Sequence, residues 1–343
     1  MSVSIRVFIS FYCFAAIGVP ALANQHVAVR PASNLVIQDS GKSKTDLYGI
    51  FKKGQAGDGT ARRAAYEAAT EFLKRYPDEK DPRTAELKDW VARFEIELRG
   101  VDVLISVYRD KKYAEAFQLG KQVLGTDPDN IKVLTALGYA GMPAAATGNN
   151  ELTAEAIVYA RKAIQLIETG KTPADWKPFA GRDETLGWLN YSIGVMILKT
   201  MPKDAIVHLG RAARYDGAPK QDPRVYYYMA VLYGQDFDKQ RAEYKASYEG
   251  KTETPESKAA LAKVSAIVDL MIDSYARAIA YTNANPQLRQ MFQQQESEWT
   301  TKITEFYKSR HDGSDAGLSE LIADIRTKPL PGQPAPATSL TKP

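Results

Sequence analysis

The stretch PESKAALAKVSAIVDLMIDSYARAIAY, residues 255–281, decides the fold class. Its apolar residues recur at steps of three or four, which places them on one face of a helix. They are Leu261, Val264, Val268, Met271, Tyr275 and Ile279. Thr254 can accept hydrogen bonds from the first helical turn, and Pro255 occupies the first helical position, where an N–H would have no helical partner. The stretch predicts a long amphipathic helix.

Helical spacing extends outward from this stretch, from about Asp46 to Arg326. The proline signal for a helix start recurs at Asp81-Pro82, Thr172-Pro173 and Asp222-Pro223. No stretch alternates apolar and polar residues between turn signals, so no strand is expected. The sequence therefore predicts an all-α fold.

Several segments repeat one spacing of small and apolar residues. The two best matched are Ala65, Ala69, Phe72, Pro77 and Ala116, Gly120, Val123, Pro128. Partial matches are Leu137-Gly138 with Ala156, Ala160 and Ala163; Gly194 with Ala205, Leu209 and Ala212; Met229-Ala230 with Tyr233; and Ser274, Ala278, Tyr281 and Pro286. Small side chains let antiparallel helices approach closely, and the proline ends the second helix. The pattern predicts stacked helical hairpins.

This spacing resembles the tetratricopeptide repeat, whose second helix carries Ala, Phe, Ala and a closing Pro. The resemblance implies an α-α superhelical solenoid of antiparallel hairpins over residues 46–286. Its repeats are expected to be irregular, because Pro77 and Pro128 are 51 residues apart, whereas the family period is about 34. Residues 287–327 are expected to form capping helices, and residues 328–343 a Pro-rich disordered tail.

The N-terminus has the layout of an export signal. A charged start, an apolar run and small residues before Asn24 predict a cleavable secretory signal over residues 1–23, with an uncleaved anchor as the alternative. Residues 24–45 are expected to form a flexible arm. Cys13 is the single cysteine of the chain and lies in the signal, so the mature chain would have no thiol. These features predict a periplasmic or secreted protein, and the repeat style indicates a bacterial source.

Composition and charge narrow the classes of partner. The 343 residues include 45 Lys plus Arg and 41 Asp plus Glu, a formal net charge of +4. Both signs are spread along the chain, so no nucleic-acid partner is expected. No apolar run after the signal is long enough to span a bilayer, so the mature chain is expected to have no transmembrane segment.

The motif search favours a protein without catalytic chemistry. The chain has no HExxH, GxSxG, P-loop or dinucleotide-binding motif. None of His26, His208 and His311 has a second histidine at helical spacing. We therefore expect no catalytic residue, no metal and no cofactor. Asn190-Tyr191-Ser192 matches a glycosylation acceptor, but it falls inside a predicted packed helix.

Asp269, Asp273 and Arg277 stand four residues apart and form one polar stripe. We interpret the stripe as a solvated or salt-bridged face. The alternative, a general acid and base for glycoside cleavage, requires two carboxylates across a cleft and not along one helix.

In the tetratricopeptide family the concave groove is lined by the first helix of each hairpin, and such grooves bind extended peptides or partner domains. Carrying that register onto this chain implies eight partner-binding residues. They are Tyr108, Arg109, Lys132, Tyr139, Trp188, Tyr191, Arg224 and Tyr227. Aromatic residues and arginine are enriched at interfaces. The alternative is that several of these aromatics fill the core between repeats.

The function expected from the sequence is a non-enzymatic exported scaffold that binds a protein or peptide partner in this groove. A mildly basic, aromatic groove suits an acidic or carboxylate-ended ligand. The alternative is a helical-repeat protein that binds or processes cell-envelope glycans, because aromatic grooves also stack sugars. A carboxylate pair facing the groove would favour an enzyme.

Overall fold

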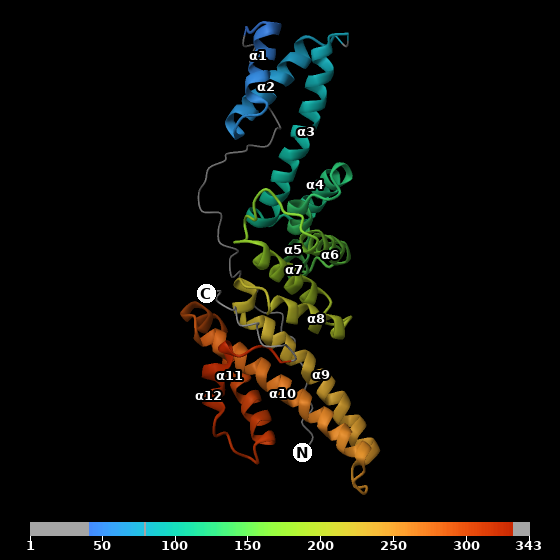
Figure 1. Ribbon diagram of the computed structural model, residues 1–343, viewed down its shortest axis with the longest axis vertical. Coiled ribbons are helices and arrows are strands. Elements are labelled where there is room, and N and C mark those ends of the chain that lie inside the picture. The colour runs from blue at the N-terminus through green and yellow to red at the C-terminus, as the bar shows by residue number, and fades with distance from the viewer. Residues whose placement is uncertain (1–40, 79, 332–343) are drawn as a thin grey trace, which may run out of the picture. The chain divides into compact units, whose positions relative to one another are not determined.

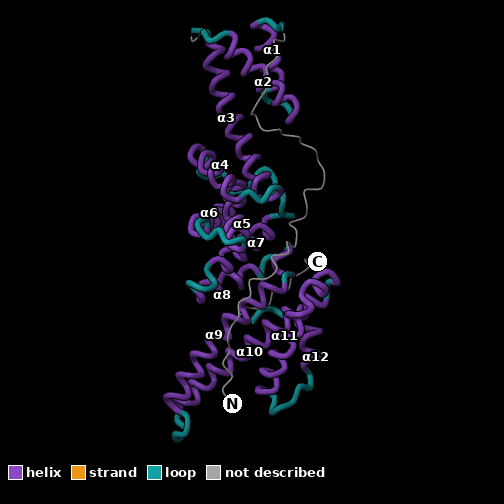
Figure 2. The backbone as a smooth tube through the Cα atoms, turned by 180° about the vertical axis from the view of Figure 1, so that it is seen from behind, coloured by secondary structure: helices purple, strands orange, loops and turns teal. Residues whose placement is uncertain are grey.

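The described part of the chain is all helical, as the sequence predicts. A computed structural model describes residues 41–78 and 80–331, and this part contains twelve α-helices and no strand (Figures 1 and 2). The predicted signal, most of the predicted arm and residues 332–343 of the predicted tail lie outside the described residues. The described residues divide into two compact units, 41–137 and 138–331.

The first unit begins at a capped helix. Its helices are α1 (Lys44–Gly54), α2 (Gly59–Arg75), α3 (Pro82–Leu104), a π-helical turn (Ile105–Arg109), α4 (Tyr113–Thr126) and the start of α5 (Ile131–Ala146). The Ser43 hydroxyl accepts from the Asp46 N–H at 3.2 Å, and the Asp46 carboxylate accepts from the Ser43 N–H at 3.0 Å. This capping box starts the helix two residues before the expected Asp46.

Each helix of the first unit packs on the next, α1 on α2, α2 on α3 and α3 on α4. The predicted repeat residues Ala65, Ala69 and Phe72 are fully buried between α1 and α3, together with Leu47 and Phe51. Packing between sequence neighbours is typical of a helical solenoid.

The second unit continues this pattern. Its helices are the rest of α5, α6 (Thr153–Glu168), α7 (Arg182–Met196), α8 (Pro202–Ala212), α9 (Pro223–Tyr248), α10 (Pro255–Asn283), α11 (Pro286–Arg310) and α12 (Leu318–Asp324). Each helix from α6 to α10 packs on the next helix along the chain. Leu261 is 48% exposed, whereas the last four apolar residues of the α10 stripe, from Val268 to Ile279, are buried. The reason is its place near the α9–α10 turn, where these two helices extend past their neighbours (Figure 1).

Small residues set the distance between neighbouring helices. A Cβ atom added at Gly138 would lie 2.7 Å from the Ala160 Cα of α6, and one added at Gly194 would lie 2.9 Å from the Leu209 side chain of α8. Both distances are too short for non-bonded carbon atoms. These two glycines allow the close approach that the spacing predicts.

Three of the four predicted proline starts are confirmed. Pro82, Pro223 and Pro255 open α3, α9 and α10, each after a side-chain cap. The prediction at Thr172-Pro173 is wrong, because these residues lie in the connection between α6 and α7. No cap hydrogen bond follows there, and the next helix begins at Arg182 after Gly181.

The start of the predicted tail is packed. The expected capping helices are α11 and α12, with Ile303 and Tyr307 buried. The short helix Ile325–Thr327 lies on α10, Leu330 is buried, and the Arg277 guanidinium donates to the Pro329 carbonyl at 2.8 Å. The chain is therefore held to residue 330.

A methyl group added at the close contact of Gly138 with Ala160 tests this packing. We expect Gly138→Ala to destabilise the protein by about 1–3 kcal/mol, because α5 and α6 must move apart. Gly210→Ala is the matched control: it also lies in a helix, and no atom comes within 4 Å of its added Cβ. It should stabilise by about 0.5–1 kcal/mol. Urea unfolding of both variants measures the difference, and equal effects would contradict the close approach.

Candidate functional site

The eight predicted groove residues divide between the two units. Tyr108, Arg109 and Lys132 belong to the first unit, with Tyr108 and Arg109 on the π-helical turn. The Arg109 guanidinium is exposed and donates to Asp110 at 2.7 Å. The other five residues are Tyr139, Trp188, Tyr191, Arg224 and Tyr227, all in the second unit. The structure brings these five together.

The rings of Tyr139, Trp188, Tyr191 and Tyr227 are part of a continuous set of aromatic contacts in the second unit, here called the aromatic cluster. It consists of Phe179, Tyr139, Trp188, Tyr191, Tyr228, Tyr227, Trp299 and Phe292, in order of contact, with ring centroids 5.2–6.4 Å apart. The members come from α5, α7, α9, α11 and the connection before α7. Contact distances of this range are typical of attractive aromatic pairs.

The side chains of the aromatic cluster differ in how far they are buried. Trp188 is 4% exposed and Tyr191 is 1% exposed, so both fill the core, in agreement with the alternative interpretation of the groove aromatics. Tyr139, Tyr227 and Tyr228 are half-buried. The ring surface that a partner can contact is therefore on these three tyrosines.

Arg224 forms a fork with Asp222, which the sequence analysis names only as part of a helix-start signal. Its Nε donates to Asp222 Oδ1 at 3.0 Å and its Nη2 donates to Asp222 Oδ2 at 2.6 Å. The guanidinium lies over the Tyr191 ring, 5.9 Å from its centroid. Burial disfavours the charged form of Arg224, but Tyr191 and Asp222 outweigh this effect, so the pKa of Arg224 lies above its usual value. The guanidinium of Arg224 therefore stays charged.

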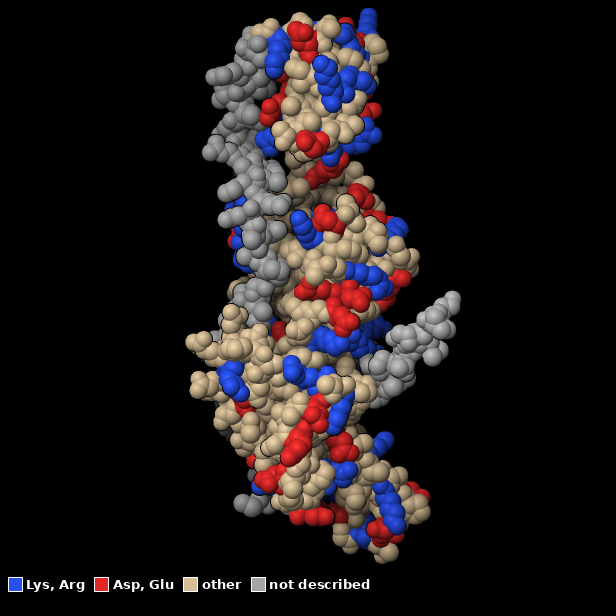
Figure 3. Space-filling view, turned by 60° about the vertical axis from the view of Figure 1, so that its left-hand side comes forward, with Lys and Arg blue, Asp and Glu red and all other residues tan. Residues whose placement is uncertain are grey.

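This pairing changes the expected charge of the groove. Arg224 and Arg109 are each bound to a neighbouring aspartate, so neither contributes a free positive charge. At both arginines the expected positive charge is offset by the paired aspartate. Figure 3 shows acidic and basic side chains interspersed over one face of the molecule. The sequence signal that could have shown the pairing is the run Asp-Pro-Arg at 222–224.

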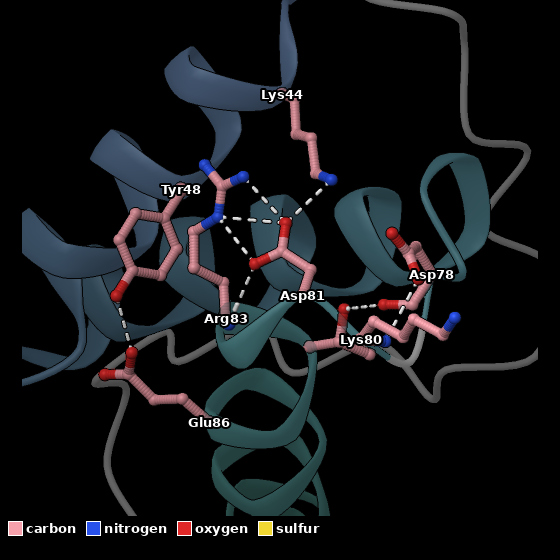
Figure 4. Close-up of polar contacts among 8 residues, drawn as sticks. Lys44, Tyr48, Asp78, Lys80, Asp81, Arg83 and Glu86 are labelled. Carbon is pink, nitrogen blue, oxygen red and sulfur yellow. Dashed lines mark hydrogen bonds and ion pairs between the residues drawn. The ribbon is translucent and has the colours of Figure 1, made fainter.

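The same run at 81–83 forms the same fork in the first unit (Figure 4). Arg83 Nε donates to Asp81 Oδ1 at 2.9 Å, Arg83 Nη2 donates to Asp81 Oδ2 at 2.7 Å, and Lys44 reaches Asp81 at 2.7 Å. Arg83 lies over the Tyr48 ring, and the Tyr48 hydroxyl donates to Glu86 at 2.5 Å. This fork ties the start of α1 to the start of α3.

The tyrosine beside the second fork lacks such an acceptor. Among the described residues the buried Tyr191 hydroxyl has no hydrogen-bond partner. Burial raises the pKa of Tyr191 far above its usual value, so the hydroxyl stays protonated and remains a donor. A buried donor without an acceptor carries a desolvation cost of about 1–3 kcal/mol.

Two other polar features of the second unit, the motif at 190–192 and the Asp269–Asp273–Arg277 stripe, have partners within the structure. Asn190 is fully buried, its amide donates to the Leu186 carbonyl at 2.8 Å, and its oxygen is 2.9 Å from His208 Nδ1. The acceptor motif at 190–192 is therefore inaccessible. Asp273 pairs with Arg277 at 2.7 Å and Asp269 pairs with Arg310 of α11 at 2.8 Å, which confirms a salt-bridged stripe.

The described residues contain no group of three or more His, Cys, Asp or Glu side chains placed to hold a metal ion. None of the described helices has the length and apolar character needed to cross a membrane.

The Asp81 fork should stabilise the first unit in a pH-dependent way. Its two cations, Arg83 first and then Lys44, hold the pKa of Asp81 well below its usual value. The contribution is present above the unfolded-state pKa of about 3.9 and is lost as pH falls toward the folded value. We expect Asp81→Asn, which keeps the helix cap, to lower Tm at pH 7 and to have a shrinking effect below pH ~4. Asp89→Asn, at an exposed position of α3, is the control; an equal effect of both would contradict the role of the fork.

His208 predicts a second pH effect. Burial, then Arg211 and Arg161, lower the pKa of His208 to about 4, against the weaker opposite effect of Asp204. The unfolded chain, with a histidine pKa of about 6.5, binds the proton first as pH falls, so stability declines from pH ~6.5 to ~4. His208→Gln should flatten this part of the stability curve. Unfolding at intervals between pH 7 and pH 4 measures the slope, and an unchanged slope would show that His208 is not responsible.

Comparison with known proteins supplies no relative on which to base a function. No protein-family model, curated protein or solved structure matches this chain. Function is therefore argued from the aromatic cluster and the contacts around it.

Proposed function

We propose that this chain is a non-enzymatic exported scaffold of the tetratricopeptide type, which binds a protein or peptide partner through the aromatic cluster. The observation that carries the proposal is the contiguity of the cluster. Five residues that the family register assigns to a groove, from three different helices, meet at one place.

The packing of the helices supports this proposal. Successive helices pack on one another, and the close contacts at Gly138 and Gly194 match the small-residue positions of the resemblance. Export is supported by the layout of residues 1–23, with a periplasmic or extracellular location and a bacterial source following from it.

The accessible chemistry of the cluster suits a peptide. Half-buried Tyr139, Tyr227 and Tyr228 offer large apolar rings with polar tips, the composition favoured at protein interfaces. The two tryptophans of the cluster, which have the largest rings and would be the best platforms for a sugar, are buried: Trp188 is 4% exposed and Trp299 is 2% exposed. This burial favours a protein partner over the glycan alternative.

Photo-crosslinking tests the proposal without emptying the core. A photoreactive phenylalanine analogue placed at Tyr139 or Tyr227 should crosslink to one and the same protein in cells of the source organism. The matched control positions are Val158 on α6 and Val207 on α8, which are 62% and 53% exposed. The analogue at these positions should not crosslink to that protein. Mass spectrometry identifies the adduct.

The outcomes separate the two functions. A partner site at the cluster is supported if the same protein adduct forms at Tyr139 and Tyr227 and does not form at Val158 and Val207. A glycan adduct would support the carbohydrate function instead, and equal adducts at all four positions would contradict a defined site.

A further inference from the structure

The last described residues of the chain are held on α10 in the way that a peptide ligand is held. Arg277 of α10 is 3% exposed, and its Nη2 donates to Asp273 at 3.2 Å and to the backbone carbonyl of Pro329 at 2.8 Å. The next side chain, Leu330, is buried, and the short helix Ile325–Thr327 packs on α10. The pair Asp273 and Arg277, here called the α10 site, therefore has its ligand in place.

Three consecutive residues of the segment each present a different chemical group. Lys328 presents a cation near Asp273: burial raises the pKa of Asp273, whereas the charges of Arg277 and Lys328 lower it. Pro329 presents the carbonyl that Arg277 binds, and Leu330 presents an apolar side chain that becomes buried. The ligand of the α10 site is therefore a Lys-Pro-Leu sequence.

The charge balance and the buried donor select this ligand. Asp273 pairs with Arg277 at 2.7 Å and compensates its charge, so a further anion beside the pair would be buried without a counter-charge. Without a carbonyl from the segment, a buried N–H of Arg277 would lose its acceptor, which is unfavourable. The site therefore takes a neutral carbonyl and an adjacent cation, and not an acidic peptide.

The backbone of the segment is suited to binding as an extended peptide. Lys328 has φ −85° and ψ 143°, which is the polyproline II conformation. Pro329 and Pro331 have no N–H group, so they leave no backbone donor unsatisfied, and their fixed φ keeps the segment extended before it binds.

The connection that leads to the segment is strained. Between the end of α11 at Arg310 and the start of α12 at Leu318, three residues have left-handed backbone conformations: Asp312 with φ 50°, Gly313 with φ 86° and Gly317 with φ 90°. Asp312 is not a glycine, so this conformation costs free energy that opening of the turn releases. Strained connections favour exchange of a terminal element between two copies of a chain, because each copy makes the same contacts again on the other.

We propose that Asp273 and Arg277 form a binding site for an extended Lys-Pro-Leu segment, which residues 328–330 fill within one molecule and which the same residues of a second copy fill when two chains associate. The second copy is the occupant because the ligand seated on the site is a sequence that every copy carries, at the end of a strained connection. This proposal goes beyond the partner proposed for the aromatic cluster and does not depend on it.

A labelled peptide IRTKPLPG, residues 325–332, is the probe for the site, titrated against full-length chains by fluorescence polarisation. Leu330→Asp in the chain stops its own segment from docking and leaves the α10 site intact. This variant should bind the peptide about tenfold or more tightly than the unmodified chain, whose own segment keeps the site filled. Leu340→Asp, the same substitution outside the described residues, is the matched control and should bind as weakly as the unmodified chain.

A mixture of two variant chains tests the second copy as the occupant. One chain carries Leu330→Asp and keeps only the site; the other carries Asp273→Asn with Arg277→Met and keeps only the segment. Replacing both members of the pair avoids an unpaired buried charge. Sedimentation of the two differently labelled chains should show a heterodimer, whereas Leu340→Asp in place of Leu330→Asp should give none, because that chain fills its own site.

Circular dichroism verifies that the variants are folded, and Leu330→Ala replaces Leu330→Asp if the added charge unfolds the chain. Equal peptide affinity of the Leu330→Asp and Leu340→Asp chains would overturn the binding site. Peptide binding without a heterodimer, or equal association in the two mixtures, would overturn the second copy as its occupant.

Discussion

Neighbouring helices approach each other very closely at a few glycines, and the rest of the structure depends on that close approach. Gly138 lies against Ala160 so closely that a single methyl group would collide with the main chain. Because α5 and α6 are held at this distance, and α7 and α8 at the comparable contact of Gly194 with Leu209, the larger side chains must fill the spaces between successive hairpins. The aromatic cluster fills such spaces.

Local rules explain why most of the fold could be predicted from the sequence. The caps at Asp81, Asp222 and Thr254 bind backbone groups only two or three residues away, so the sequence shows them directly. The small residues of the repeats also follow a short spacing that can be read from the sequence. The failure at Thr172-Pro173 has the same origin, since a proline permits a helix start but does not supply the apolar face that stabilises one. The packing of the segment at Pro329 was missed because its hydrogen bond comes from Arg277, far away in sequence.

The candidate site was only partly predictable. The family register picked residues of α5, α7 and α9 that lie together, but it could not give the burial of Trp188 and Tyr191, which depends on how several helices close over them. The charge of the groove was missed for a different reason. Arg224 folds back on Asp222 two residues earlier, so its charge is cancelled locally. A second copy of that run at 81–83 forms the same fork beside Tyr48, which shows that the pairing is a property of the Asp-Pro-Arg sequence at a helix start.

The contact between Arg277 and Pro329 sets where the folded domain ends. A protease that cut after Thr327 would remove the carbonyl that satisfies a guanidinium 3% exposed, together with the buried Leu330. Asp273 would still pair with Arg277, but the N–H that donates to Pro329 would lose its acceptor. A truncation that removes Pro329 and Leu330 therefore damages the packed interior and not a loose end of the chain.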